Sequence, residues 1–368
     1  MVHDRQRLKE LQALPLERKI MISQARLIEW YKHFKGEVYV SFSGGKDSTV
    51  LADVFARICQ QFGWKLYLVF VNTGLEYPEI QKFVKEYAEW LKNTYNIEVE
   101  LEILRPKMRF DEVIKKYGYP LISKEVGETV SQAKKSLETG SQKYTYRLKK
   151  LNGELLNKKG QPSQFNMTKY KPLLYTNFYT SNKCCDIMKK QPVKKYEKET
   201  DKKPITAQMA NESALRQSIW IRNGCNAFDG KRPISNPMSF WTEQDVLQYI
   251  KRYNIPIASV YGDIVYETDP EQIRFEEIGI DARQSEKLTT TGCKRTGCIF
   301  CAFGSHLEKN PNRFQMLKQT HPRQYEYCIG GGEFNEQGIW QPSKEGLGMG
   351  YVFDELNKIY GENFIKYK

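Results

Sequence analysis

The stretch Ser41-Phe42-Ser43-Gly44-Gly45-Lys46-Asp47-Ser48-Thr49 decides how the chain folds. It directly follows an apolar run, residues 38–42, that predicts a buried strand, and it leads into residues 49–61, whose pattern predicts a helix. The two adjacent glycines let the backbone turn tightly and approach a ligand without intervening side chains. Backbone amides and the helix N-terminus would then point at an anion, so the stretch predicts a phosphate-binding loop.

The side chains of the loop add to this prediction. Ser43 and Ser48 can supply hydroxyl donors, and Lys46 can supply a positive charge. The loop is not the P-loop of kinases and GTPases, because the spacing Gly-x4-Gly-Lys-Ser/Thr is absent. The simpler alternative is a tight turn from strand to helix with ordinary capping.

Strands and helices alternate along the following residues. Further strands are predicted at 66–71 and 99–104, with a helix at 78–93 between them, and an amphipathic helix that stops at Gly36 precedes the first strand. Strands that alternate with helices of this length imply an α/β fold with a doubly wound parallel sheet. Ligands of such sheets bind outside the carboxyl ends of the strands, so we expect the active site there.

Composition sets the broad class of protein. At about 150 residues per domain, the length of 368 residues predicts two domains. With 40% hydrophobic and 13% aromatic residues, the chain is neither disordered nor collagen-like nor a coiled coil. No apolar run approaches the roughly 20 residues of a membrane span, and the first residues lack the apolar core of a signal peptide. We therefore expect a cytoplasmic protein without a membrane partner.

Positive charge is concentrated in one segment. Residues 132–204 contain 18 Lys or Arg against 6 Asp or Glu, a net +12, while the whole chain carries +13. Such a segment predicts phosphate-bearing partners, from nucleotides to nucleic acid. Glycine and proline interrupt residues 127–172, which we interpret as a basic insertion, with a solvated hairpin as the alternative. The predicted organisation is a helical segment at 1–36, a nucleotide-binding domain at 37–260 that contains this insertion, and a cysteine-rich region at 261–368.

The loop resembles that of the PP-loop family, the adenine-nucleotide alpha-hydrolase-like proteins. Their signature Ser-Gly-Gly-x-Asp-Ser is matched by Ser43, Gly44, Gly45, Asp47 and Ser48. The resemblance implies a Rossmann-like fold that binds ATP or an adenylyl compound and supports chemistry at or next to the α-phosphate.

Four further segments resemble the phosphoadenylylsulfate (PAPS) and adenylylsulfate (APS) reductases, in the same order along the chain. They are residues 71–79 with Thr73 and Gly74, residues 183–193 with Cys184 and Cys185, residues 205–216 with Glu212 and Arg216, and residues 241–261. Asn72, Ile80 and Met209 depart from the pattern. The resemblance implies that Thr73, Gly74 and Glu212 help to bind the nucleotide and that Lys46, Asp47 and Arg216 act in catalysis. From spacing alone, Glu212 and Arg216 could equally form an ordinary ion pair on one helix face.

Eight cysteines without an export signal favour thiols or metal ligands over disulfides. Cys298 and Cys301 have a two-residue gap in a glycine-bearing loop, which lets two thiolates converge on one metal. In the APS reductases a Cys-Cys pair and a distant Cys-x-x-Cys hold a [4Fe-4S] cluster. The resemblance therefore implies that Cys184, Cys185, Cys298 and Cys301 are its ligands here.

Two alternatives stay open for these cysteines. Cys293, Cys298, Cys301 and Cys328 could form a C-terminal site for zinc or an iron–sulfur cluster, as a local cluster does in DNA phosphorothioation proteins of the same superfamily. The cysteines could also be buried or redox-active thiols without a metal.

The reaction is less clearly indicated than the binding. PAPS and APS reductases carry a nucleophilic cysteine in a Glu-Cys-Gly…His segment near the C-terminus. Residues 361–368 lack this segment, and Cys328 lies nearest to that role without the flanking pattern.

The leading hypothesis is an oxidoreductase-like enzyme of sulfur metabolism that cleaves at or beside the α-phosphate of ATP, APS or PAPS, including reductive release of sulfite with a thiol reductant protein. A second is an ATP pyrophosphatase that uses Mg²⁺, with Asp47 as a ligand, to adenylylate an acceptor such as nucleic acid for sulfur insertion. A third is a nucleotide-responsive binding module without catalysis.

Overall fold

The computed structural model describes residues 3–230, 232–267 and 287–368, so residues 268–286 of the predicted cysteine-rich region lie outside the described residues. The chain forms two compact units. The first comprises Met1–Asn72, Glu76–Leu104 and Val193–Thr296, and the second comprises Thr73–Leu75, Arg105–Pro192 and Gly297–Lys368. No helix in the described ranges has both the length and the apolar character that crossing a membrane requires.

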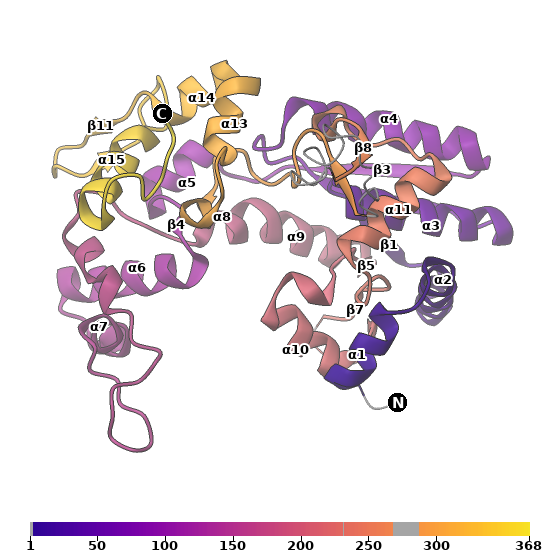
Figure 1. Ribbon diagram of the computed structural model, residues 1–368, viewed down its shortest axis with the longest axis horizontal. Coiled ribbons are helices and arrows are strands. Elements are labelled where there is room, and N and C mark those ends of the chain that lie inside the picture. The colour runs from indigo at the N-terminus through magenta and orange to yellow at the C-terminus, as the bar shows by residue number, and fades with distance from the viewer. Residues whose placement is uncertain (1–2, 231, 268–286) are drawn as a thin grey trace, which may run out of the picture. The chain divides into compact units, whose positions relative to one another are not determined.

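The first unit is built on a six-stranded sheet with the order β3-β2-β1-β5-β7-β6 (Figure 1). Its strands are β1 (Val38–Ser41), β2 (Leu66–Val71), β3 (Val99–Leu104), β5 (Lys203–Ile205), β6 (Asn226–Ala227) and β7 (Ile234–Ser235). All neighbouring strands are parallel except the edge pair β6 and β7. The predicted α/β class with a mostly parallel, Rossmann-like sheet is confirmed.

The order of the strands places a topological switch point beside β1. Val40 of β1 pairs with Leu68 of β2 on one side and with Ile205 of β5 on the other. The chain therefore leaves β1 toward one half of the sheet and returns through β5 to the other half. In open α/β sheets the crevice for a ligand forms at the carboxyl ends of two strands that diverge in this way. The loops after β1 and β5 are thus the expected walls of the site.

The helices of the first unit follow the predicted spacing closely. They are α1 (Arg5–Gln12), α2 (Leu16–His33), α3 (Lys46–Phe62), α4 (Pro78–Tyr95), most of α9 (Gln191–Thr200), α10 (Ala214–Asn223) and α11 (Glu243–Tyr253). α3 packs against α2, α4 and α11. It begins three residues before the predicted residue 49, because Gly45 has an extended conformation and acts as the N-cap. A short antiparallel pair, β8 (Ile264–Tyr266) and β9 (Leu288–Thr290), completes the unit.

A buried carboxylate joins three helices of the first unit. Asp53 of α3 is fully buried and accepts hydrogen bonds from the hydroxyls of Tyr95 and Tyr249, at 2.6 and 2.7 Å. It also pairs with Arg57, whose Nε lies 2.9 Å from Oδ2. Tyr95 belongs to α4 and Tyr249 to α11, so one satisfied anion fixes both helices on α3. Because α3 begins at the loop, this network also holds the site in place.

A second buried ion pair attaches α2 to α11. Nζ of Lys19 lies 2.7 Å from Oδ2 of Asp245, and both side chains are nearly inaccessible. Replacing Lys19 by methionine leaves the Asp245 carboxylate buried without its cation, so we expect the free energy of unfolding to fall by about 3–5 kcal/mol. Urea unfolding followed by tryptophan fluorescence measures the change. Lys82→Met, at an exposed ion pair with Glu86, is the control and should shift stability by less than about 1 kcal/mol. Equal midpoints for the two variants would contradict the assignment.

The second unit surrounds a two-stranded parallel pair of β4 (Leu121–Ile122) and β10 (Ala302–Phe303). Its helices include α5 (Phe110–Tyr117), α6 (Lys124–Thr139), α7 (Thr145–Asn152), α13 (Arg313–Thr320), α14 (Pro322–Ile329), α15 (Met349–Tyr360) and the 3₁₀ helix η2 (Thr168–Tyr175). The basic segment predicted as an insertion at 127–172 is therefore mainly helical. A hairpin-like bridge occurs in it between Leu156 and Pro162.

Candidate functional site

The loop after β1 requires glycine at its first glycine position. Gly44 has φ +70°, and a Cβ atom there would lie 2.9 Å from Cγ2 of both Ile80 and Val84 on α4. A side chain would be strained by the backbone conformation and would also press on the helix. The loop can thus lie directly against α4 only with glycine at this position.

The two serines of the signature hold the shape of the loop. The Ser48 hydroxyl accepts a hydrogen bond from the Ser43 amide at 3.1 Å and donates one to the Gly45 carbonyl at 2.9 Å. It also lies 3.0 Å from the Ser43 hydroxyl. Ser48 is buried, whereas Ser43 is exposed. Ser48 therefore shapes the backbone, and Ser43 is the better placed of the two to meet a ligand.

The N-terminus of α3 has no side-chain cap. Gly45 is the N-cap and offers no side chain, so the amides of the first helical turn are not satisfied by a capping oxygen. The amide of Lys46 donates to the Tyr261 hydroxyl at 3.3 Å, and this hydroxyl lies 2.6 Å from Oγ1 of Thr296. A Cβ atom on Gly45 would lie 3.4 Å from the Tyr261 hydroxyl and 3.6 Å from Thr296 Oγ1. A side chain on Gly45 would therefore crowd these hydroxyls, and the N-terminus of a helix without a side-chain cap favours an anion.

Lys46 is held beside the loop by an acidic partner. Its side chain is buried, and Nζ lies 3.3 Å from Oε1 of Glu243, the first residue of α11. Nζ also lies 5.3 Å from the centre of the Tyr261 ring. The ammonium group is therefore positioned within the first unit rather than free in solvent.

Two arginines face the carboxylate of Asp47. Burial raises the pKa of Asp47, and the neighbouring charge of Glu243 adds to this, whereas the positive charges of Lys46, Arg295 and Arg216 oppose it. Burial also lowers the pKa of Arg216, and the positive charge of Arg295 lowers it further. Two guanidinium groups that repel each other next to a helix N-terminus form a local field suited to a polyanion such as a nucleotide phosphate.

The pair of Glu212 and Arg216 follows β5, on the other side of the switch point. Arg216 forms an ion pair with Glu212, one helical turn before it, and Glu212 also accepts a hydrogen bond from the Met209 amide at 2.9 Å. Ser213 caps α10 through the Arg216 amide at 3.2 Å. The ion pair that the spacing of Glu212 and Arg216 indicated is present. Arg216 also acts electrostatically on Asp47. Both expectations for Arg216 are therefore compatible with its position.

Thr73 and Gly74 form a turn that belongs to the second unit. Thr73 is buried, and its hydroxyl accepts a hydrogen bond from the Leu75 amide at 3.2 Å. Gly74 has φ +73°, and no atom lies within 4 Å of the position of a Cβ atom there. The Leu75 carbonyl accepts a hydrogen bond from the Ile299 amide at 2.8 Å, so this turn is attached to the loop that carries Cys298 and Cys301.

The second unit brings four of the predicted cysteines into one neighbourhood. Cys184 and Cys185 lie in the short helix α8 (Lys183–Cys185), which continues into a π-helical turn, Asp186–Lys190. The Cys184 thiol donates a hydrogen bond to the Cys185 sulfur, and Cys298 and Cys301 also act on the charge of the Cys184 sulfur. The Cys301 amide donates to the Cys298 carbonyl at 3.1 Å. A π-helical turn is rare and often marks a functional site.

The electrostatics of this group favour a thiolate at Cys185, whereas burial raises the pKa of Cys301. A hydrogen bond from Cys184 lowers the pKa of Cys185 to about 6, and the positive charges of Lys124, Lys189 and Lys190 also lower it. The pKa of Cys184 is raised by this hydrogen bond and by burial. Within the described residues, no three His, Cys, Asp or Glu side chains converge closely enough to hold a metal. Four cysteines in one neighbourhood are the ligand type of a [4Fe-4S] cluster, and their side chains would have to move to ligate one.

The remaining candidate cysteines have different surroundings. Cys328 is completely buried in the second unit, 3.5 Å from the sulfur of Met349, and burial raises its pKa. Cys293 belongs to the first unit, where it hydrogen-bonds to Tyr77 and burial raises its pKa. A thiol with a raised pKa is mostly protonated at neutral pH and is a poor nucleophile.

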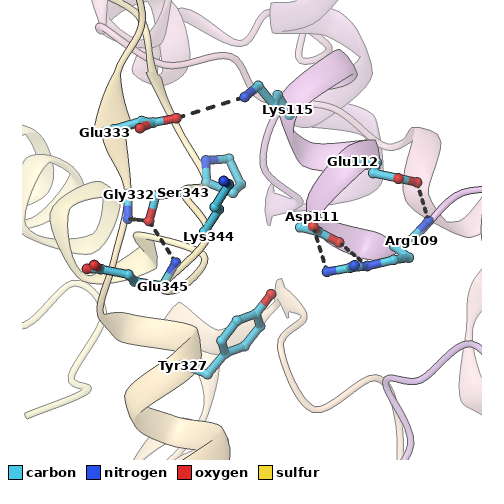
Figure 2. A pocket seen from close by; sticks show the side chains of 11 residues that line it. Arg109, Asp111, Glu112, Lys115, Tyr327, Gly332, Glu333, Ser343, Lys344 and Glu345 are labelled. Carbon is cyan, nitrogen blue, oxygen red and sulfur yellow. Dashed lines mark hydrogen bonds and ion pairs between the residues drawn. The ribbon is translucent and has the colours of Figure 1, made fainter.

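A separate pocket of about 730 Å³ lies within the second unit (Figure 2). None of the residues predicted for the site lines it. Its charged groups pair with one another: Arg109 with Asp111 at 3.0 Å, and Lys115 with Glu333 at 3.9 Å. Tyr327 points into it, as Figure 2 shows, and the Tyr327 ring lies 6.0 Å from that of Phe300 in the cysteine loop. The pocket therefore adjoins the cysteine loop through one aromatic contact.

Sequence reasoning missed four residues around the phosphate loop. They are Glu243, Tyr261, Arg295 and Thr296. In the sequence, Glu243 and Tyr261 stand out only as members of residues 241–261, one of the segments that resemble the reductases. A signal for the other two existed in the run Lys294-Arg295-Thr296 within a glycine-bearing loop, because such residues can bind phosphate.

The chain is similar to proteins of a known family. A model of the phosphoadenosine phosphosulfate reductase domain matches residues 37–121 and 107–302, which include the phosphate loop, the residues after β5 and all four cysteines of the second unit's group. An uncharacterized protein of Methanocaldococcus jannaschii is 30% identical over 105 residues, 28% of this chain and 23% of the relative. The chain thus spans under a quarter of the length of that relative. Since the domain model matches well over half of the residues, the chain belongs to the phosphoadenosine phosphosulfate reductase family, within the PP-loop superfamily.

Proposed function

We propose that the protein is an enzyme that binds an adenine nucleotide on the loop between β1 and α3 and cleaves it at or next to the α-phosphate in sulfur chemistry. The observation that carries this proposal is the uncapped N-terminus of α3 at the switch point of the sheet. Lys46, Arg216 and Arg295 act electrostatically on Asp47 in the first turn of α3 and would stabilise negative charge that develops on the phosphate or the leaving group.

One branch of the proposal is reductive release of sulfite from APS or PAPS. A thiolate would attack the sulfur, the S–O bond to the nucleotide would break, and a thiol reductant protein would then release sulfite and leave a disulfide. Cys328 is a weak candidate for this thiolate, because it is fully buried and its pKa is raised. This branch therefore requires a different thiol or a rearrangement around Cys328.

The other branch is adenylyl transfer from ATP. An acceptor oxygen would attack the α-phosphorus, the bond between the α-phosphorus and the bridging oxygen would break, and pyrophosphate would leave. Asp47 would hold Mg²⁺ in this proposal, and the ion would supply positive charge that offsets the charge of the phosphates. The burial of Cys328 is the observation that favours this branch, because adenylyl transfer needs no thiol nucleophile.

Product analysis separates the branches. The protein is purified and incubated anaerobically with ATP, APS or PAPS, with and without thioredoxin and an oligonucleotide, and the products are identified by mass spectrometry. Sulfite release that depends on thioredoxin would support the reductase, and pyrophosphate release on addition of an acceptor would support adenylyl transfer. Tight binding without turnover of any nucleotide would instead select a binding module. If the protein neither bound nor turned over any of these nucleotides, that result would contradict the whole proposal.

A further inference from the structure

One part of the second unit carries a concentrated positive charge. It consists of α6, α7, η2 and the loop at 153–167, and the three helices pack on one another. In Figure 1 the loop extends beyond α6 and α7. These elements span residues 124–175, which contain eleven Lys or Arg against four Asp or Glu, a net +7. We call α6, α7, η2 and this loop the basic lobe.

Most of the positive groups in the basic lobe are available to a partner. Lys134, Arg147 and Lys150 are engaged in the fold: Lys134 donates to the Thr176 carbonyl at 2.6 Å, and the other two pair with glutamates of α6. Lys124, the first residue of α6, acts electrostatically on Cys185. The other seven are exposed and form no ion pair with any residue that the structure describes. They are Lys135, Lys143, Lys149, Lys158, Lys159, Lys169 and Lys171.

Three exposed aromatic rings lie among these lysines. Tyr146, Phe165 and Tyr175 are 57%, 63% and 71% exposed. Tyr146 and Lys149 are three residues apart on α7 and share a face. Lys169 and Tyr175 are two turns apart on the 3₁₀ helix η2, where every third residue points the same way. Aromatic rings of this exposure beside cationic side chains are typical of surfaces on which unpaired bases stack.

The loop that presents Phe165 is fixed by internal hydrogen bonds. The Asn166 side chain accepts from the Leu155 amide at 3.1 Å and donates to the carbonyls of Gly153 and Leu155 at 3.1 and 3.0 Å. The Ser163 amide donates to the Leu155 carbonyl at 2.7 Å. A preformed loop loses little conformational entropy when it binds, so its exposed ring is available at low cost.

We propose that the basic lobe binds single-stranded nucleic acid. Lysines without an ion pair among the described residues attract the phosphates, and the exposed rings stack on bases that are not paired. A membrane surface is a poorer match, because the exposed apolar side chains are separated by polar ones and do not form one apolar helix face. This inference specifies the acceptor of the adenylyl-transfer branch, but the surface belongs to the second unit and its binding test does not depend on that reaction.

The test measures binding of a fluorescent 20-nucleotide single strand by anisotropy at 50–200 mM salt, without any adenine nucleotide. The wild-type protein should bind, with affinity that falls steeply as salt rises. Replacing Lys143, Lys149, Lys158 and Lys159 by glutamine should make the slope of log K against log salt shallower by up to about 3, at roughly 0.7 per phosphate contact. Phe165→Ala and Tyr175→Ala should each weaken binding roughly 5- to 150-fold, the effect of one lost stacking contact, with the slope unchanged.

Matched controls distinguish binding at the basic lobe from a general effect of positive charge. The control variant replaces Lys9, Lys82, Lys85 and Lys92 of the first unit by glutamine, which changes the net charge as much as the four substitutions in the basic lobe do. All four lysines are exposed and far from the basic lobe in sequence, so affinity should stay within about twofold of wild type. A duplex of the same sequence should bind more weakly and be insensitive to Phe165→Ala. Equal binding of strand and duplex, equal effects of the two lysine sets, or preference for anionic vesicles would each overturn the proposal. Nucleotide binding by the same preparation, measured separately, reports on the proposed function.

Discussion

Gly45→Val is expected to remove measurable binding of ATP, APS and PAPS while the protein remains folded. Gly45 has φ −79° and ψ 155°, a conformation open to any residue, so valine introduces no backbone strain. Its side chain would point toward Ser43, Tyr261 and Thr296, and a Cβ atom alone would lie 3.2 Å from the Ser43 hydroxyl. The added methyl groups would therefore press on these hydroxyls and crowd the N-terminus of α3.

The expected loss of affinity is at least about 100-fold, because the valine side chain would keep the anion away from the helix amides. A 100-fold loss corresponds to roughly 2.7 kcal/mol of binding free energy. Isothermal titration calorimetry measures the affinity, and circular dichroism verifies the fold. Gly45→Ala adds one carbon and should give an intermediate loss. Gly44→Ala is not an equivalent test, since its clash with Ile80 and Val84 would also reduce stability. Unchanged affinity in Gly45→Val would show that the loop does not hold the phosphates.

The fold could be predicted well because its signals are local. The buried strands and the helix caps lie in short sequence windows, so the strand predicted at 99–104 coincides with β3. The glycine pair of the loop likewise indicates the turn before α3 without any information from distant residues. The general rules for alternating strands and helices then predict a doubly wound parallel sheet, although not the order of its strands.

The rest of the site depends on contacts between distant parts of the chain. Tyr261 meets Lys46 across 215 residues, and Glu243 meets it across 197. No spacing rule connects such pairs, so Tyr261 and Glu243 were not predicted as parts of the site. The helical character of the basic segment was also missed, because glycines at its helix ends suggested loops. Gly140 and Gly153 instead terminate α6 and α7 in the left-handed conformation.

The two cysteine sets predict opposite results for two substitutions. We expect Cys184→Ser to lose the bound iron and Cys328→Ala to retain it. The structure gathers Cys184 with Cys185, Cys298 and Cys301, whereas Cys328 is buried against Met349. An iron–sulfur cluster that loses one of four thiolates is generally destabilised, so the effect on metal content should be large.

The measurement is iron, acid-labile sulfide and zinc content, with the visible absorption spectrum, in protein purified without oxygen. Cys225→Ser, in the first unit and next to Ser239, is the control and should retain the wild-type metal content. Circular dichroism of Cys328→Ala guards against a loss of metal through unfolding of the buried site. If Cys328→Ala lost the metal while folded and Cys184→Ser kept it, the C-terminal set would be correct. Wild-type protein without iron or zinc would show that these thiols serve a purpose other than metal binding, and the low pKa of Cys185 would then make it the first thiol to examine for reactivity.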